Sequence, residues 1–132
     1  MVKRILVVDD DVNVIHFLRK ELKESLPELD IVTTESGYTA LKHIMSGGID
    51  LLITDIAMPD MDGYELFLRA REQNEEIPVI MMTGFGYDPN HTVVNARNAG
   101  LGMEDVIFKP FDTDYLIKII RERLAMDTEV TK

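Results

Sequence analysis

Four short apolar runs alternate with amphipathic segments along this chain of 132 residues. The runs are ILVV at 5–8, LLIT at 51–54, VIMM at 79–82 and VIF at 106–108. Apolar and polar residues do not alternate within them, which is typical of strands that are buried on both faces of a parallel sheet. The weaker run IVTT, at 31–34, predicts a strand at the edge of the sheet.

Between the runs, apolar residues recur at three- and four-residue spacings, which predicts amphipathic helices. In chain order these stripes are Ile15, Leu18, Leu22 and Leu26; Ala40, Leu41, Ile44 and Met45; Leu66 and Ala70; and Leu116, Ile119, Ile120 and Leu124. We expect Pro27 to stop the first helix, and Gly47 with Gly48 to end the second. Asp62 followed by Glu65 is similar to a capping box that would open the third.

Residues 91–98 predict one more helix, which is short and polar, and Asp11 and Asp112 are expected to cap the first and last helices. The order is then a strand followed by a helix, repeated five times. Right-handed crossovers between parallel strands place such helices on both faces of the sheet. We therefore expect one α/β domain over residues 1–126, followed by a frayed tail at 127–132.

The amino-acid composition argues against several classes of function for this chain. Lys and Arg number 14 against 24 Asp and Glu, and the net charge of −10 argues against direct binding of nucleic acid or of an anionic membrane. The chain has no cysteine, which excludes disulfides and thiol chemistry. Because no apolar stretch is long enough to span a bilayer and no secretory signal opens the chain, we expect a cytoplasmic location.

Polar residues follow four of the predicted strands: Asp9 with Asp10, then Asp55, Thr83 and Lys109. In an open parallel sheet, ligands bind beyond the carboxyl ends of the strands. Three carboxylates in one cleft repel each other and need a cation, and oxygen ligands suit Mg²⁺. An ammonium and a hydroxyl beside them would stabilise a phosphoryl group. Asp55 stands alone at its strand end, so it is the best candidate for a nucleophile that forms an acyl phosphate.

At RILVVDDD (4–11), TDIAMPDMDG (54–63), VIMMTG (79–84) and FKPFD (108–112), the sequence resembles the receiver domain of two-component response regulators. The resemblance implies a flavodoxin-like, doubly wound domain with five helices and a five-stranded parallel sheet in the order 2-1-3-4-5. It also implies a phosphorylation switch, in which a histidine kinase or a phosphotransfer domain supplies a phosphoryl group in the presence of Mg²⁺.

The resemblance assigns a role to each site residue. The implied metal ligands are Asp9, Asp10, Asp55 and the backbone carbonyl of Ala57, and the implied phosphoryl-transfer residues are Asp55 as phosphoacceptor, Thr83 and Lys109. Asp10 is the expected direct ligand of the acidic pair. The bond between Lys109 and Pro110 would be cis, and Gly84 would leave the site open. Such a protein catalyses its own phosphorylation and slow dephosphorylation.

The sequence departs from the family in two places. Val106 occupies the usual aromatic switch position, so the family's rotation of an aromatic ring cannot be carried over to this chain. The segment 83–106 is longer than usual by about one helical turn, as in some receivers of hybrid histidine kinases. By resemblance, helix 4, strand 5 and helix 5 form the output surface, which would contact a downstream protein, an attached output domain or a second copy of the chain.

Three alternatives stay open. A phosphatase of the haloacid-dehalogenase type also uses Asp and Mg²⁺, but that family has a second Asp where this chain has Ala57. A nucleotide or flavin binder would need a glycine-rich loop after the first strand, where this chain has DDDVN at 9–13. The third is a degenerate receiver that acts only as a docking module, an alternative that Val106 keeps open.

Overall fold

The structure is a computed structural model that describes residues 2–56, 58–61, 63–84 and 106–126. Five parallel strands form one sheet in the order β2-β1-β3-β4-β5, which confirms the predicted order and the edge position of the weakest run. The strands are β1 (Arg4–Val8), β2 (Asp30–Thr34), β3 (Leu51–Asp55), β4 (Val79–Thr83) and β5 (Val106–Phe108).

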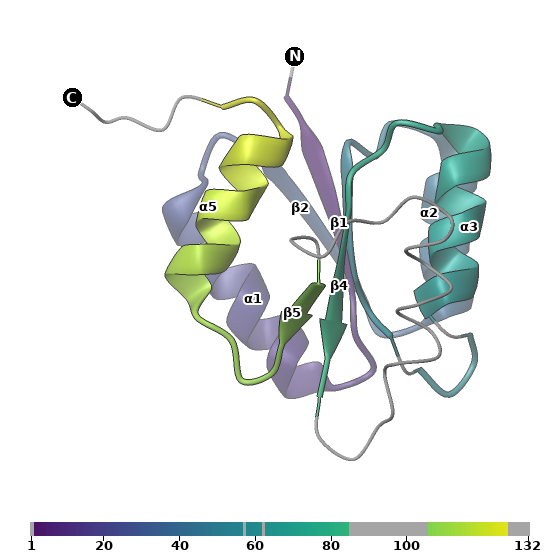
Figure 1. Ribbon diagram of the computed structural model, residues 1–132, viewed down its shortest axis with the longest axis horizontal. Helices are drawn as coiled ribbons and strands as arrows, with labels where there is room; N and C mark the ends of the chain where they lie inside the picture. Colours follow the sequence, from purple (N-terminus) through teal and green to yellow (C-terminus); the bar gives the residue numbers. More distant parts are fainter. Residues whose placement is uncertain (1, 57, 62, 85–105, 127–132) are drawn as a thin grey trace.

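Helices cover both faces of this sheet. Figure 1 shows α1 and α5 on one face and α2 and α3 on the other. Their bounds are α1 (Val12–Ser25), α2 (Gly37–Ser46), α3 (Gly63–Gln73) and α5 (Thr113–Arg123). The helix predicted at 91–98 and the tail predicted at 127–132 lie outside the described residues.

The sheet has an apolar layer on each face, which explains why apolar and polar residues do not alternate along the strands. In β1, Ile5 and Val7 pack with α1 and α5, whereas Leu6 and Val8 pack with α2 and α3. All four side chains are fully buried, because neighbouring positions point to opposite faces and both faces are covered. The double burial makes the sheet a rigid support for whatever its strand ends carry.

Most of the predicted helix ends are confirmed. The carboxylates of Asp11 and Asp112 each accept a backbone N–H two residues later at 2.9 Å, and α2 stops at Gly47, whose φ is 81°. The prediction that Met45 belongs to the buried stripe is wrong, because it is 58% exposed. Met45 lies one residue beyond the buried Ile44, and this rotation of about 100° turns it away from the sheet. The capping box proposed for α3 includes Asp62, which lies outside the described residues.

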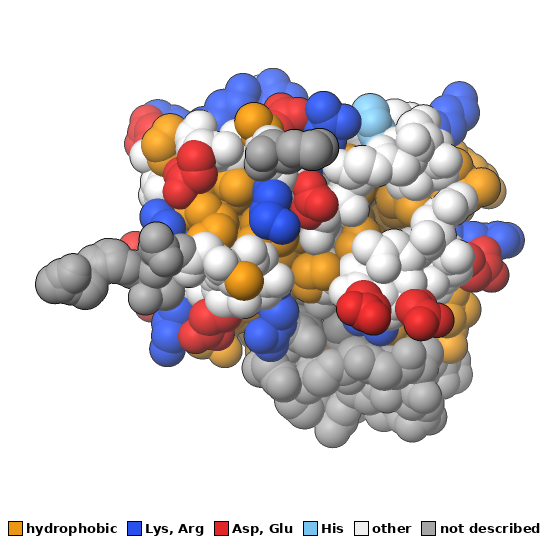
Figure 2. Space-filling model, turned by 90° about the horizontal axis from the view of Figure 1, so that it is seen from above, with side chains coloured by type: hydrophobic (Ala, Val, Ile, Leu, Met, Phe, Trp, Pro, Cys, Tyr) orange, Lys and Arg blue, Asp and Glu red, His pale blue; other side chains and the backbone are white. Residues whose placement is uncertain are grey.

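At the end of the sheet where the strands begin, basic and acidic side chains are interspersed (Figure 2). There Arg4 forms a salt bridge with Asp30 at 2.7 Å, and its backbone N–H donates to Asp50 at 2.8 Å. These contacts tie the starts of β1, β2 and β3 together. Within the described ranges, no helix has the length and apolar character needed to cross a membrane.

Candidate functional site: an acidic cluster at the strand ends

The sheet brings the predicted site residues to one edge. Asp55 and Thr83 are the last residues of β3 and β4, while Asp9 and Lys109 directly follow β1 and β5. In the parallel register, Thr83 of β4 lies beside Phe108 of β5, so the strands end at nearly the same level. Burial of the strands therefore fixes the positions of side chains that are far apart in the sequence.

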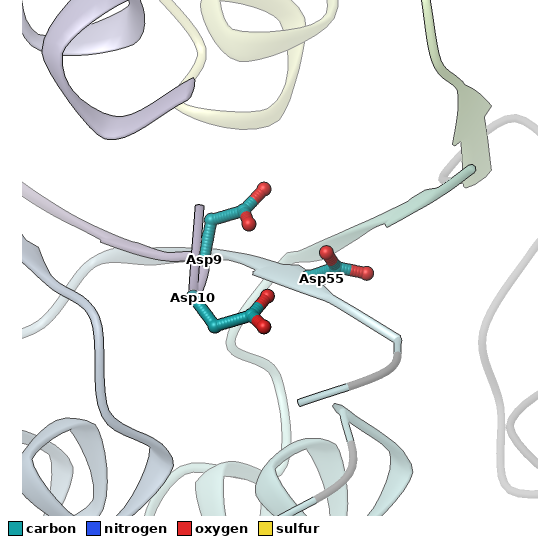
Figure 3. Close-up of side chains that lie close together, drawn as sticks. All are labelled: Asp9, Asp10 and Asp55. Carbon is teal, nitrogen blue, oxygen red and sulfur yellow. The ribbon is translucent and has the colours of Figure 1, made fainter. Parts of the chain in front are cut away.

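Three carboxylates form a compact cluster at this edge. One oxygen from each of Asp9, Asp10 and Asp55 lies within 4.8 Å of the other two. Figure 3 shows Asp9 and Asp10 extending from the end of β1 toward the end of β3, where Asp55 lies. Asp9 is fully buried and Asp55 is 8% exposed, whereas Asp10 is open to solvent. The cluster thus has two fixed carboxylates and one that faces the solvent.

Lys109 joins two members of this cluster. Its Nζ donates to Asp9 Oδ2 at 2.7 Å and to Asp55 Oδ2 at 2.9 Å. Burial works to lower the pKa of Lys109, but the two carboxylates outweigh it and raise this pKa above its usual value. The side chain therefore stays an ammonium at neutral pH. The bond between Lys109 and Pro110 is cis, as the resemblance implied.

Asp9 is the most constrained of the carboxylates. Its other oxygen accepts the backbone N–H of Asp11 at 2.9 Å. Burial raises the pKa of Asp9, and the hydrogen bond from Lys109 opposes this effect only in part. A second cation beside Asp9 would favour its ionised form, which is a first indication that the cluster suits a metal ion.

The donor set fits a hard divalent cation such as Mg²⁺. All three side chains offer carboxylate oxygens, which are hard ligands, and Lys109 pairs with two of the three, Asp9 and Asp55. The exposed carboxylate of Asp10 leaves room for the waters that Mg²⁺ retains. Ala57, whose backbone carbonyl was the fourth expected ligand, lies outside the described residues.

Thr83 contributes a buried hydroxyl to this edge of the sheet. Its Oγ1 is buried and has no hydrogen-bond partner within the described part of the chain. Its carbonyl, in contrast, accepts the backbone N–H of Lys109 at 2.7 Å. An unsatisfied buried hydroxyl costs free energy, which would be recovered by an acceptor introduced at the strand ends.

An apolar hollow of about 510 Å³ adjoins the site. It is lined by Asn13, Val14, Phe17, Gly84, Lys109, Pro110 and Phe111. Of these residues, Gly84, Lys109 and Pro110 were expected at the site from the sequence, whereas Phe17 was not. The signal in the sequence was that Phe17 lies off the apolar stripe of its helix, and in the structure it is 49% exposed.

Residues 5–121 match the response regulator receiver domain, and the chain therefore belongs to this family. It is 34% identical over 120 residues to the transcriptional regulatory protein TcrA of Mycobacterium tuberculosis (strain ATCC 25618 / H37Rv), covering 89% of this chain and 44% of TcrA. It is 36% identical over 114 residues to the sensor protein EvgS of Escherichia coli (strain K12), covering 85% of this chain and 9% of EvgS.

A solved structure agrees with this assignment. The response regulator receiver domain protein (CheY-like) from Methanospirillum hungatei JF-1 superimposes with a TM-score of 0.84 at 30% identity, covering 95% of each chain. The family match confirms the predicted class of protein and its role in phosphorylation-dependent two-component signalling. The chain spans less than half of the length of TcrA and of EvgS.

Proposed function

We propose that this protein accepts a phosphoryl group on Asp55 from a histidine kinase or a phosphotransfer domain. The observation that carries the proposal is the position of Lys109, whose ammonium bridges Asp55 and the buried Asp9 beside a third carboxylate. An Asp55 oxygen attacks phosphorus, the P–N bond of the donor phosphohistidine breaks, its electron pair returns to the imidazole nitrogen, and an acyl phosphate forms.

The proposed metal ligands are Asp9, Asp10, Asp55 and the carbonyl of Ala57. Mg²⁺ held there would neutralise charge on the phosphoryl oxygens. The chain's own cation, Lys109, already lies 2.9 Å from an Asp55 oxygen and would pair with the phosphoryl group once it is attached to this carboxylate. The buried hydroxyl of Thr83 would donate to the same group and gain the partner that it lacks within the described residues.

The switch would follow from these two new partners. Lys109 and Thr83 are joined by a backbone hydrogen bond of 2.7 Å, so a shift of either one moves the ends of both β4 and β5. Val106 is an aliphatic residue packed in the core beside α2 and α3, and we propose that the signal passes along this strand pair without an aromatic rotation.

The output would be a protein contact around helix 4, β5 and α5. Phe108 of β5 is 60% exposed and Tyr115 of α5 is 45% exposed, which supports a contact surface on these elements. The occupant would be a downstream protein, a covalently attached output domain or a second copy of the chain. A degenerate docking module is the second candidate, supported by Val106 but opposed by the complete set of charged site residues.

The test is phosphorylation by acetyl phosphate, followed by Phos-tag electrophoresis. We expect a shifted band that requires Mg²⁺ and is absent in Asp55→Asn. Asp50→Asn is a matched control, because Asp50 lies at the opposite end of β3 and its carboxylate accepts the N–H of Arg4. An unshifted wild-type protein, or a shift that persists in Asp55→Asn, would contradict the proposal.

A further inference from the structure

The segment that connects β3 to α3 folds back, so that its last part contacts the end of β3. The backbone N–H of Gly63 donates to the carbonyl of Ile56 at 2.7 Å. A Cβ atom at Gly63 would lie only 2.4 Å from the carbonyl oxygen of Asp55, so the helix begins in direct contact with the strand. This contact fixes one end of the connection, but the residues between need a second anchor.

Asp60 supplies that anchor by reaching the start of α2. Its carboxylate accepts from the hydroxyl of Ser36 at 2.8 Å and from the backbone N–H groups of Gly37 and Tyr38, both at 3.2 Å. Burial works to raise the pKa of Asp60, but these three hydrogen bonds outweigh it and lower this pKa. The carboxylate is therefore firmly ionised where the helix dipole favours a negative charge.

Packing beside this anchor is tight. A Cβ atom at Gly37 would lie 2.8 Å from the Cβ of Met61, a distance that real side chains do not tolerate. Only glycine at this position lets the first turn of α2 approach the β3–α3 connection so closely. The hydrogen bonds of Asp60 and the packing of Met61 thus act at the same place.

The start of α2 is in turn tied to the acidic pair. The carbonyl of Thr34 accepts the backbone N–H of Asp9 at 3.3 Å, and the hydroxyl of Thr34 accepts the N–H of Ser36 at 3.3 Å. Contacts therefore run without a gap from Asp9 through Thr34 and Ser36 to Asp60. This series of contacts, here called the Asp60 bracket, links Asp9 at the end of β1 to the connection that follows β3.

We propose that Asp60 is a positioning residue for the acidic cluster. By holding the β3–α3 connection against the start of α2, which reaches Asp9 through Thr34, the Asp60 bracket adds to the β1–β3 strand pairing in setting the spacing between the carboxylates. Asp60 would thereby raise the affinity of the site for Mg²⁺, although its own carboxylate points to α2 and is not a ligand. The inference rests on the proposed function, in which Mg²⁺ binds to this cluster.

The test measures Mg²⁺ affinity from amide chemical shifts in NMR titrations, since the chain has no tryptophan to report binding by fluorescence. Asp60→Ala is expected to bind Mg²⁺ about tenfold more weakly, at the lower end of the range for residues that orient metal ligands. Asp60→Asn is expected to retain more of the affinity than Asp60→Ala, because its amide oxygen can still accept from Ser36 and Tyr38, although its NH2 group cannot accept from Gly37. The Mg²⁺ affinity of Ser36→Ala should lie between the affinities of Asp60→Asn and Asp60→Ala.

A purely structural role makes a different prediction. Asp50→Ala also removes a carboxylate that accepts a backbone N–H, but at the opposite end of the sheet. We expect it to lower the stability to urea while leaving the Mg²⁺ affinity within twofold of wild type. The inference would be overturned if the Mg²⁺ affinity of Asp60→Ala also stayed within twofold of wild type. It would likewise be overturned if Asp50→Ala lost as much Mg²⁺ affinity as Asp60→Ala. In either case Asp60 would be only a helix cap.

Failure of the proposed function has its own signature. If wild-type protein shows no shift changes at Asp9, Asp10 or Asp55 on titration with Mg²⁺, both the metal site and the role of Asp60 are overturned. If wild type binds and Asp60→Ala binds equally, only the role of Asp60 is lost. Should Asp60→Ala fail to fold, Ser36→Ala decides in its place, because it keeps the Asp60 carboxylate and removes one hydrogen bond of the bracket together with the N-cap hydrogen bond from Thr39.

Discussion

At the scale of single residues, the charge balance of the site depends on Lys109. Its ammonium is the partner of a fully buried carboxylate, Asp9, and of the nearly buried Asp55. Removing one member of a buried ion pair leaves the other charge without compensation, and this costs far more than the loss of a surface pair.

Lys109→Met is therefore expected to lower the free energy of unfolding by about 3 kcal/mol in the presence of EDTA. Mg²⁺ should restore part of this loss, because a metal ion supplies the positive charge that the variant lacks. Urea denaturation with and without Mg²⁺ measures both effects. Lys20→Met is the control, since its pair with Glu24 is exposed and should contribute less than about 1 kcal/mol. Equal losses in the two variants would contradict this account.

Residues of the site differ in how well the sequence predicted them. Asp9, Asp55, Thr83 and Lys109 could be found because each follows an apolar run, and strand ends converge in a parallel sheet. Asp60 could not, because its partners Ser36, Gly37 and Tyr38 lie 22 to 24 residues away, and their contact depends on how α2 packs beside the β3–α3 connection.

At the scale of elements, apolar runs predicted the strands well because both faces of the sheet are covered. Helices were harder, since a stripe shows which face is buried but not how wide the buried face is. Ala40 and Ile44 face the sheet, whereas Met45 is exposed and accepts a hydrogen bond from Gln73 at 3.0 Å. The close approach of α3 to β3 at Gly63 also leaves no periodic signal in the sequence.

Gly63→Ala tests that close approach. Its Cβ would lie 2.4 Å from the carbonyl oxygen of Asp55 and 3.0 Å from the Cα of Ile56, both rigid backbone atoms. We expect a loss of about 3 kcal/mol in the free energy of unfolding, measured by urea denaturation. Gly84→Ala is the matched control, because its Cβ would make an ordinary contact of 3.7 Å with Lys109, and it should be nearly neutral. A neutral Gly63→Ala would show that the helix is free to move away from the strand.

At the scale of the whole molecule, the acidic cluster links metal binding to folding. The carboxylates come from two strands that converge only in the native fold, so an ion bound there stabilises the folded chain and not the unfolded one.

The layers of the fold were predictable from burial, but the order of the strands came only from the resemblance, because periodicity does not say which strands are neighbours.

Mg²⁺ at a hundredfold excess over its dissociation constant should raise the free energy of unfolding by about 2.7 kcal/mol. Asp10→Asn, which removes the exposed ligand, is expected to lose most of this gain. Asp11→Asn removes the same charge from the next residue and keeps the helix cap, so it should retain the gain. Urea denaturation with and without Mg²⁺ gives the comparison, and an equal gain in Asp10→Asn and wild type would exclude Asp10 as a ligand.

The central claim is that the fold makes Asp55 the phosphoacceptor, and locating the phosphoryl group tests it most directly. Borohydride reduces an aspartyl phosphate to homoserine, which tandem mass spectrometry can assign to one position after treatment with acetyl phosphate and Mg²⁺. We predict homoserine at position 55, and none there in Asp55→Asn. Homoserine at position 9 or 10 instead, or at no position in wild-type protein, would contradict the account.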